Sequence, residues 1–140
     1  MKKQYSYMIP GPPVTKKNSQ QIVRAGKGGR LFIKQSARYE QYEATASYFL
    51  SPKPPDPIDY PVNVKCTYFM PSRRRVDLSN LLAATHDVLT KFFILADDNR
   101  DVIASVDGSR VYYDKENPRV EITIKPIDEE KYRKWKEDPD

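Results

Sequence analysis

The chain has 140 residues and a mass of 16.3 kDa, which is the length of one domain with a single hydrophobic core. Its one cysteine excludes an internal disulfide framework, and its one histidine excludes zinc-finger spacing, so a bound metal must be held by oxygen ligands. No segment approaches the ~18 apolar residues of a membrane span or resembles a signal peptide, so we expect a cytoplasmic protein with no membrane partner.

The net charge of +5 is unevenly distributed along the chain. The first 39 residues contain nine Lys or Arg and no acid, whereas the other 101 contain 15 basic and 19 acidic residues, a net −4. A basic block beside an acidic remainder favours a nucleic-acid partner. Two alternatives are a solubilising surface and a protein-interaction domain whose basic segment contacts an acidic partner.

The first half of the chain predicts one strand and one helix. Residues 5–9 form a short strand that prolines end, and residues 14–35 form a basic, glycine-rich segment that we interpret as a flexible hairpin-like loop. Ser36 is the expected N-cap of a helix that continues to about Leu50. Residues 51–61 are a proline-rich connector.

The second half predicts a strand, a helix and further strands. Residues 62–70 alternate in polarity, and residues 78–93 carry an apolar stripe of helical period. After an acidic turn at 96–101, an extended segment at 102–113 is broken by Asp107 and Gly108, and 118–126 forms a last strand before a charged tail or short helix at 128–140. This order indicates an α+β fold, a sheet with helices packed on it, and leaves the topology open.

Acidic residues at element ends are candidates for a metal site. Asp77 begins the second helix, and Asp97, Asp98 and Asp101 follow about 20 residues later. Carboxylates that converge are best tolerated where a divalent cation or a basic partner compensates their charge, and a site with such a cation hydrolyses phosphodiesters without histidine.

The same residues also have ordinary structural interpretations. Asp77 is a good N-cap, Asp97 and Asp98 suit a polar turn, and Asp87 with Lys91 is a plain helix pair. His86 has no visible nucleophile partner, so we expect it at the surface or supporting a ligand.

Three consecutive arginines, Arg73, Arg74 and Arg75, precede the helix and suit bidentate phosphate binding, although a solvated loop is the alternative. Most aromatic residues fall at core-facing positions, which favours packing over base stacking.

The central block resembles the RusA family of Holliday-junction resolvases, found mainly in phages and prophages. The resemblance is carried by Arg-Arg-Arg-Val-Asp-Leu-Ser-Asn-Leu at 73–81, Asp-Val-Leu at 87–89, Asp-Asp at 97–98 and Pro-Arg-Val-Glu-Ile at 118–122. The opening at 9–17 and the first helix at 36–43 are also similar, so the resemblance covers most of residues 5–125.

The resemblance implies a homodimeric endonuclease that depends on Mg²⁺ or Mn²⁺ and cuts four-way DNA junctions. It implies a mixed sheet flanked by helices in a single nuclease domain at 1–127. Asp77 and Asp98 match metal carboxylates, with Asp97 beside them. The residues expected to hold the DNA backbones are Lys16, Lys17, Arg24, Lys27, Arg30, Arg73, Arg74 and Arg75.

Two positions depart from the family pattern. Ser79 replaces the usual second Asp, and Ala83 replaces a frequent catalytic lysine, whereas Asn80 is retained. A hydroxyl is a poor magnesium ligand, so one negative charge is missing. Either Asp97 or Asp101 compensates, or activity is weak, or the protein binds DNA without cutting it. Lys91 is two turns, ~12 Å, along the helix from Ala83 and is not expected to replace the lysine.

Overall fold

The computed structural model describes residues 2–16, 20–24, 26, 28–128 and 130–137. Its elements follow one another in the order β1 (Tyr5–Pro10), β2 (Gln20–Arg24), β3 (Leu31–Gln35), α1 (Ala37–Phe49), β4 (Val62–Met70), α2 (Leu78–Lys91), β5 (Ile103–Ser105), β6 (Arg110–Tyr113), β7 (Arg119–Pro126) and α3 (Glu130–Glu137). The predicted strands and helices are confirmed, and the fold is the expected α+β type with a mixed sheet.

The main sheet has β7 between β1 and β4, both antiparallel to it. On its other edge β4 pairs in parallel with two short strands, β5 beside its start and β6 beside its end. The break between β5 and β6 falls where the sequence predicts it, at a turn in which Gly108 has φ +86° and a Cβ would lie 3.3 Å from the Lys65 side chain. The segment at 102–113 therefore forms one interrupted edge of the sheet.

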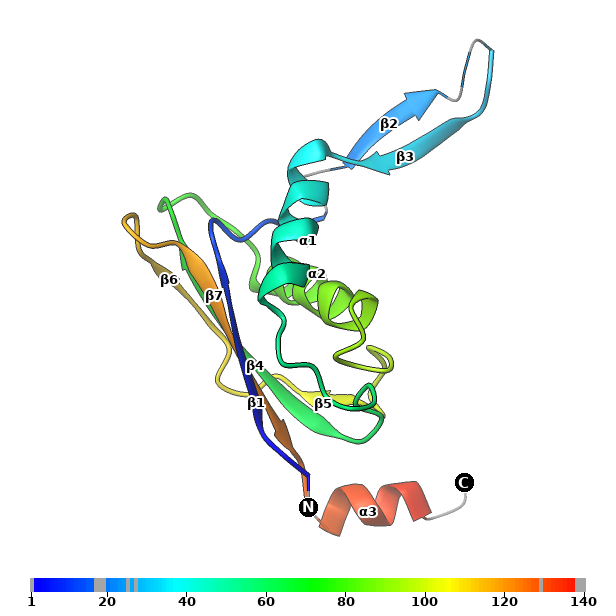
Figure 1. Cartoon of the computed structure of the whole chain (residues 1–140), viewed down its shortest axis with the longest axis vertical. Helices are drawn as coiled ribbons and strands as arrows, with labels where there is room; N and C mark the ends of the chain where they lie inside the picture. Colours follow the sequence, from blue (N-terminus) through cyan, green and yellow to red (C-terminus); the bar gives the residue numbers. More distant parts are fainter. Residues whose placement is uncertain (1, 17–19, 25, 27, 129, 138–140) are drawn as a thin grey trace.

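Helices α1 and α2 lie on the same face of this sheet (Figure 1). The alternating residues of β4 that face them, Val62, Val64 and Cys66, are fully buried, and burial raises the pKa of the Cys66 thiol to about 12. A buried hydrogen bond of 2.7 Å joins the Tyr68 hydroxyl to Thr85 and links β4 to α2. In the described part of the chain, no helix has the length and apolar character needed to cross a bilayer.

The basic segment at 14–35 contains a β-hairpin rather than a loop alone. Strands β2 and β3 pair with each other, in register from Gln20 opposite Gln35 to Arg24 opposite Leu31. Figure 1 shows this hairpin extending beyond α1 and away from the main sheet. Its arginines at the turn are therefore carried away from the body of the domain.

The proline-rich connector is anchored to the segment that precedes the acidic turn. Ile58 is buried, and its backbone N–H donates to Ile94 while its carbonyl accepts from Ala96, at 2.9 and 2.8 Å. These bonds hold the chain immediately before Asp97 against the core. The connector thus helps to position the acidic turn.

Candidate functional site

Asp77 occupies the N-cap position of α2 without capping it through its side chain. Its backbone carbonyl accepts from Asn80 and Leu81, at 3.1 and 3.2 Å. Among the described residues, its exposed carboxylate accepts one hydrogen bond, from the Asn80 side chain, with Nδ2 3.3 Å from Oδ2. The carboxylate is therefore oriented by Asn80 and remains open to a ligand.

The acidic turn after α2 uses one of its carboxylates to shape the backbone. The Asp98 N–H donates to Asp97 Oδ1 at 2.7 Å, and the Asp101 N–H donates to Asn99 Oδ1 at 2.9 Å. Asp97 thus has the turn-forming role that is one of its two predicted interpretations. Asp98 is exposed and makes no ion pair with a described residue.

Asp98 lines a cavity of about 400 Å³, which we call the mixed-charge cavity. Its lining residues come from the N-terminal loop, α1, α2 and the acidic turn: Lys16, Tyr39, Glu43, Asp87, Thr90, Lys91 and Asp98. Lys16 pairs with Asp87 at 3.2 Å, and Lys91 pairs with Glu43 at 3.1 Å. The predicted pairing of Asp87 with Lys91 within α2 is therefore wrong, because each residue pairs with another segment.

His86 precedes Asp87 on α2 and is half-buried rather than at the surface. Its buried Nε2 has no hydrogen-bond partner among the described residues. Burial lowers the pKa of His86, while the negative charges of Asp98 and Asp87 oppose that shift. His86 is thus held mainly as neutral imidazole at neutral pH.

The described residues contain no group of three or more His, Cys, Asp or Glu side chains arranged to hold a metal ion. The predicted trio of Asp77, Asp97 and Asp98 is thus not gathered into one cluster. Asp98 shares its cavity with Asp87, and Asp77 lies ten positions (87 − 77), or ~15 Å of helix, before Asp87. The exposed carboxylates nevertheless suit Mg²⁺, which binds through one or two carboxylates and completes its shell with water and substrate phosphate.

The two positions that depart from the family pattern, Ser79 and Ala83, are exposed on α2. Neither provides a charge. The exposure of both positions means that longer side chains fit there without disturbing the core.

The predicted DNA-binding residues separate into several places. Arg24 and Arg30 are exposed on the hairpin, and Lys16 is committed to its ion pair with Asp87, whereas Lys17 and Lys27 lie outside the described residues. The three consecutive arginines also diverge: the Arg73 guanidinium lies 4.3 Å from the Tyr113 ring centroid, while Arg74 and Arg75 line a pocket.

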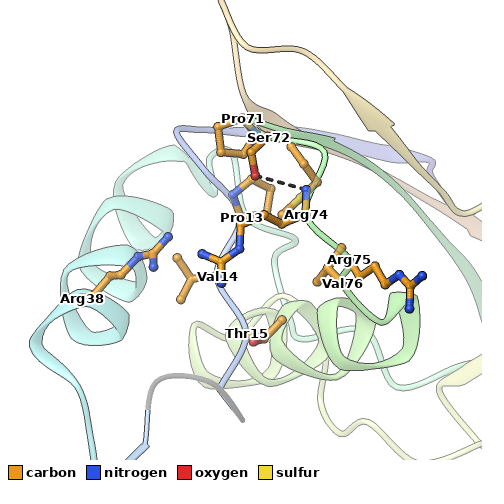
Figure 2. A pocket seen from close by; sticks show the side chains of 10 residues that line it. Pro13, Val14, Thr15, Arg38, Pro71, Ser72, Arg74, Arg75 and Val76 are labelled. Carbon is orange, nitrogen blue, oxygen red and sulfur yellow. Dashed lines mark hydrogen bonds between the residues drawn. The ribbon is translucent and has the colours of Figure 1, made fainter.

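This second cavity, which we call the basic pocket, has a volume of about 420 Å³. Arg38 of α1 also lines it, together with Pro13, Val14 and Thr15 of the N-terminal loop (Figure 2). Arg38 is a functional candidate that sequence reasoning counted in the basic block without singling it out. Its place beside Arg74 is set by packing, so no spacing signal identifies it.

A family model described as endodeoxyribonuclease RusA matches residues 10–125, from the end of β1 to the end of β7. The match includes the carboxylates, the mixed-charge cavity and the basic pocket. A curated relative, crossover junction endodeoxyribonuclease RusA of Aquifex aeolicus (strain VF5), is 35% identical over 88 residues. These residues are 62% of this chain and 66% of the relative, so the chain spans just under two thirds of the relative's length.

Proposed function

Since this chain belongs to the RusA family of endodeoxyribonucleases, we propose that it cuts branched DNA, and specifically four-way junctions, by metal-dependent hydrolysis of a phosphodiester bond. The observation that carries this proposal is the family match over residues 10–125, which spans both cavities. The name of the Aquifex relative supports the junction as substrate. Such a substrate is found in the cytoplasm of a bacterial or phage-infected cell.

The proposed metal carboxylates are Asp77 and Asp98, each of which would provide one exposed carboxylate to a shell completed by water and substrate phosphate, with Asp97 shaping the turn that holds Asp98. If these carboxylates hold Mg²⁺ or Mn²⁺, the ion would supply the polarisation of the phosphoryl oxygen and the lowered pKa of water that phosphodiester hydrolysis requires. Asn80 keeps the Asp77 carboxylate oriented through its 3.3 Å bond. Burial lowers the pKa of His86, so this imidazole adds no positive charge beside Asp98 at neutral pH.

The basic residues are proposed to hold the DNA backbones. Arg24 and Arg30 of the hairpin provide positive charge away from the sheet, and Arg73, Arg74 and Arg75 provide it next to α2. Lys17 and Lys27, which lie outside the described residues, are proposed to contribute to the same binding. Contacts to phosphates position a duplex without reading its sequence, so recognition depends on the shape of the junction.

We further propose that the active form is a homodimer. A four-way junction has two-fold symmetry, and cutting it symmetrically requires two sites related by the same symmetry. An isologous dimer provides that pair of sites from one chain.

The test is cleavage of a labelled synthetic four-way junction, compared with matched duplex and single strand, in Mg²⁺, Mn²⁺ or chelator. We expect paired symmetric nicks that need the metal and prefer the junction. Equal cutting of duplex and junction contradicts the substrate, and cutting in chelator contradicts the metal.

A second candidate function, junction binding without cleavage, is favoured by the exposed Ser79 and Ala83. Tight binding without nicks in either metal supports it. In that case Ser79→Asp is the informative variant, because it supplies the missing carboxylate on the exposed face of α2. Cleavage gained by this variant would show that the scaffold is intact and that only the metal site is weakened.

A further inference from the structure

The basic pocket concentrates positive charge without any compensating acid. It lies between the N-terminal loop, α1 and the loop before α2, and its ten lining residues include Arg38, Arg74 and Arg75 and no Asp or Glu. Figure 2 shows Arg38 and Arg74 pointing toward one another across the pocket, whereas Arg75 points away from Arg38. Two segments far apart in sequence thus direct guanidinium groups into one concave site.

Neither Arg38 nor Arg74 forms an ion pair with a described residue. The Arg119 guanidinium, by contrast, is held by two carboxylates, those of Asp114 and Glu121, at 3.1 and 3.0 Å. Like charges that face one another repel, and an anion between them converts the repulsion into two attractions. A bound anion would therefore stabilise the facing guanidinium groups of Arg38 and Arg74.

The pocket is supported by local structure on both sides. The Arg74 N–H donates to Ser72 Oγ at 3.4 Å, which restrains the loop before α2 (Figure 2). Arg38 belongs to the first turn of α1, where Ser36 Oγ accepts the Tyr39 N–H at 3.2 Å and orders the helix start. The helix dipole adds partial positive charge at this end.

We propose that Arg38 and Arg74 clamp one phosphate group of a DNA strand in this pocket. Guanidinium groups bind phosphate oxygens in a fork geometry, and a volume of about 420 Å³ accommodates a phosphate with its adjoining sugar. The identity of the anion as DNA phosphate rests on the proposed function, whereas the anion site itself rests on the geometry of the pocket. Arg38 becomes a DNA-positioning residue on α1.

The test compares Arg38→Gln with Arg110→Gln, a matched control on β6 that removes the same charge from an exposed site outside the pocket. Junction binding is measured in chelator at several salt concentrations. Arg38→Gln should reduce the slope of log affinity against log salt by about 1 and weaken binding at every sequence tested, because one phosphate contact is lost. Arg110→Gln should keep the wild-type slope. Equal slopes for all three proteins overturn the proposal.

Titration of each protein with inorganic phosphate, followed by chemical shifts of backbone amides at 14–15 and 72–76, separates this proposal from the proposed function. A saturable response in the wild type that Arg38→Gln loses supports the anion site. If the wild type responds to phosphate but Arg38→Gln leaves the salt slope of junction binding unchanged, the pocket holds an adventitious ion only, and the proposal is overturned. If the wild type binds phosphate here but no junction, the assignment to DNA is wrong for the pocket and for the chain.

Arg38→Lys provides a second variant that keeps the charge but removes the fork. Because Arg38 is exposed, both substitutions should leave the fold intact, which the chemical shifts of the core residues check directly. An affinity for the junction between those of the wild type and Arg38→Gln supports bidentate binding. Wild-type affinity in Arg38→Lys would overturn the clamp in favour of simple charge attraction.

Discussion

The basic pocket and the mixed-charge cavity have similar volumes, about 420 and 400 Å³, but different charge compositions. Successive residues of one loop contribute to them, since Thr15 lines the first and Lys16 lines the second. The basic pocket contains three arginines and no acid. The mixed-charge cavity contains two lysines and three carboxylates, and both lysines are in ion pairs.

The difference shows which charges serve the fold and which remain available. In the mixed-charge cavity, Asp87 and Glu43 are in ion pairs with the two lysines. Of the three carboxylates that line it, Asp98 is the one without an ion pair to a described residue. In the basic pocket, none of the three arginines forms an ion pair with a described residue. The groups that lack an ion pair in the described part of the chain, Asp98 and these arginines, are those to which we assign a metal and a phosphate, whereas the paired groups hold segments of the fold together.

The largest expected effect is on cleavage when the unpaired carboxylates are neutralised. Asp98→Asn and Asp77→Asn should each lower the cleavage rate more than about 100-fold, since losing groups that merely support a metal ligand already costs about 10- to 100-fold. Junction binding in chelator should be retained. Rates are measured on a labelled junction at saturating protein.

Two further Asp→Asn variants give this prediction its controls. Asp107 lies in the exposed turn between β5 and β6, and Asp107→Asn should leave the rate unchanged. Asp87→Asn removes the partner of Lys16 and should lower the rate only a few-fold. If Asp87→Asn abolishes cleavage and Asp77→Asn does not, the metal is held by Asp87 and Asp98, and the assignment of Asp77 is wrong.

Arg74→Glu would place a carboxylate in the basic pocket, so that the pocket would contain both charges, as the mixed-charge cavity does. The new carboxylate faces Arg38, so it should occupy the place proposed for the phosphate. Junction binding should weaken by about 10- to 100-fold, which corresponds to the free energy of one hydrogen bond to a charged group. Stability should change by less than ~1 kcal/mol, because the new ion pair is exposed. Binding curves and urea denaturation of the same sample measure both quantities, and unchanged binding would contradict the clamp.

Tyr39→Phe tests whether the lining of the mixed-charge cavity tolerates the loss of a polar group. The Tyr39 hydroxyl is buried without a hydrogen-bond partner among the described residues, and burial, with Glu43 and Asp87, raises its pKa, so it stays neutral. Removing an unsatisfied hydroxyl should leave stability unchanged or raise it by about 1 kcal/mol. A clear loss of stability in urea denaturation would show that the hydroxyl has a partner in solution.

The smallest effect concerns the pH dependence of stability through His86. Burial lowers its folded-state pKa below the ordinary value of 6.5, although Asp98 and Asp87 reduce this shift. As pH falls below about 6.5, the unfolded chain binds a proton that the folded protein does not, so stability decreases until the folded-state pKa is passed. His86→Gln should lose less stability between pH 7.5 and 5.5 than the wild type. An equal loss in both proteins would contradict the assigned shift.

Patterns of local polarity predicted most of the fold. The alternation over 62–70 matched β4, the Ser36 cap and helical spacing matched α1, and the apolar stripe from Leu78 matched α2. These predictions succeeded because each element buries one face, and a buried face requires apolar residues at the strand or helix period along the sequence. The basic hairpin was not resolved as two strands, since glycines and charges obscure its alternation.

The candidate site was predicted less completely, because charge partners depend on long-range packing. Asp87 and Lys91 have the correct spacing for a helix pair, yet each finds its partner in another segment. Arg38 and Arg74 are 36 positions apart (74 − 38) and share a pocket. The parallel pairing of β5 and β6 with β4 likewise depends on contacts that no local pattern encodes.

The strands and helices, the basic N-terminal block beside its acidic remainder, and the motifs that resemble the RusA family are all properties of neighbouring residues, so the order of the amino acids alone predicts them. Which charges neutralise one another is set by the packing of the folded chain. An ion pair depends on a distance of a few ångströms between side chains, and that distance is set by how the N-terminal loop, α1, α2 and the acidic turn pack together. For this reason only the folded chain identifies Asp98, which has no ion pair within the described ranges, and the facing Arg38 and Arg74.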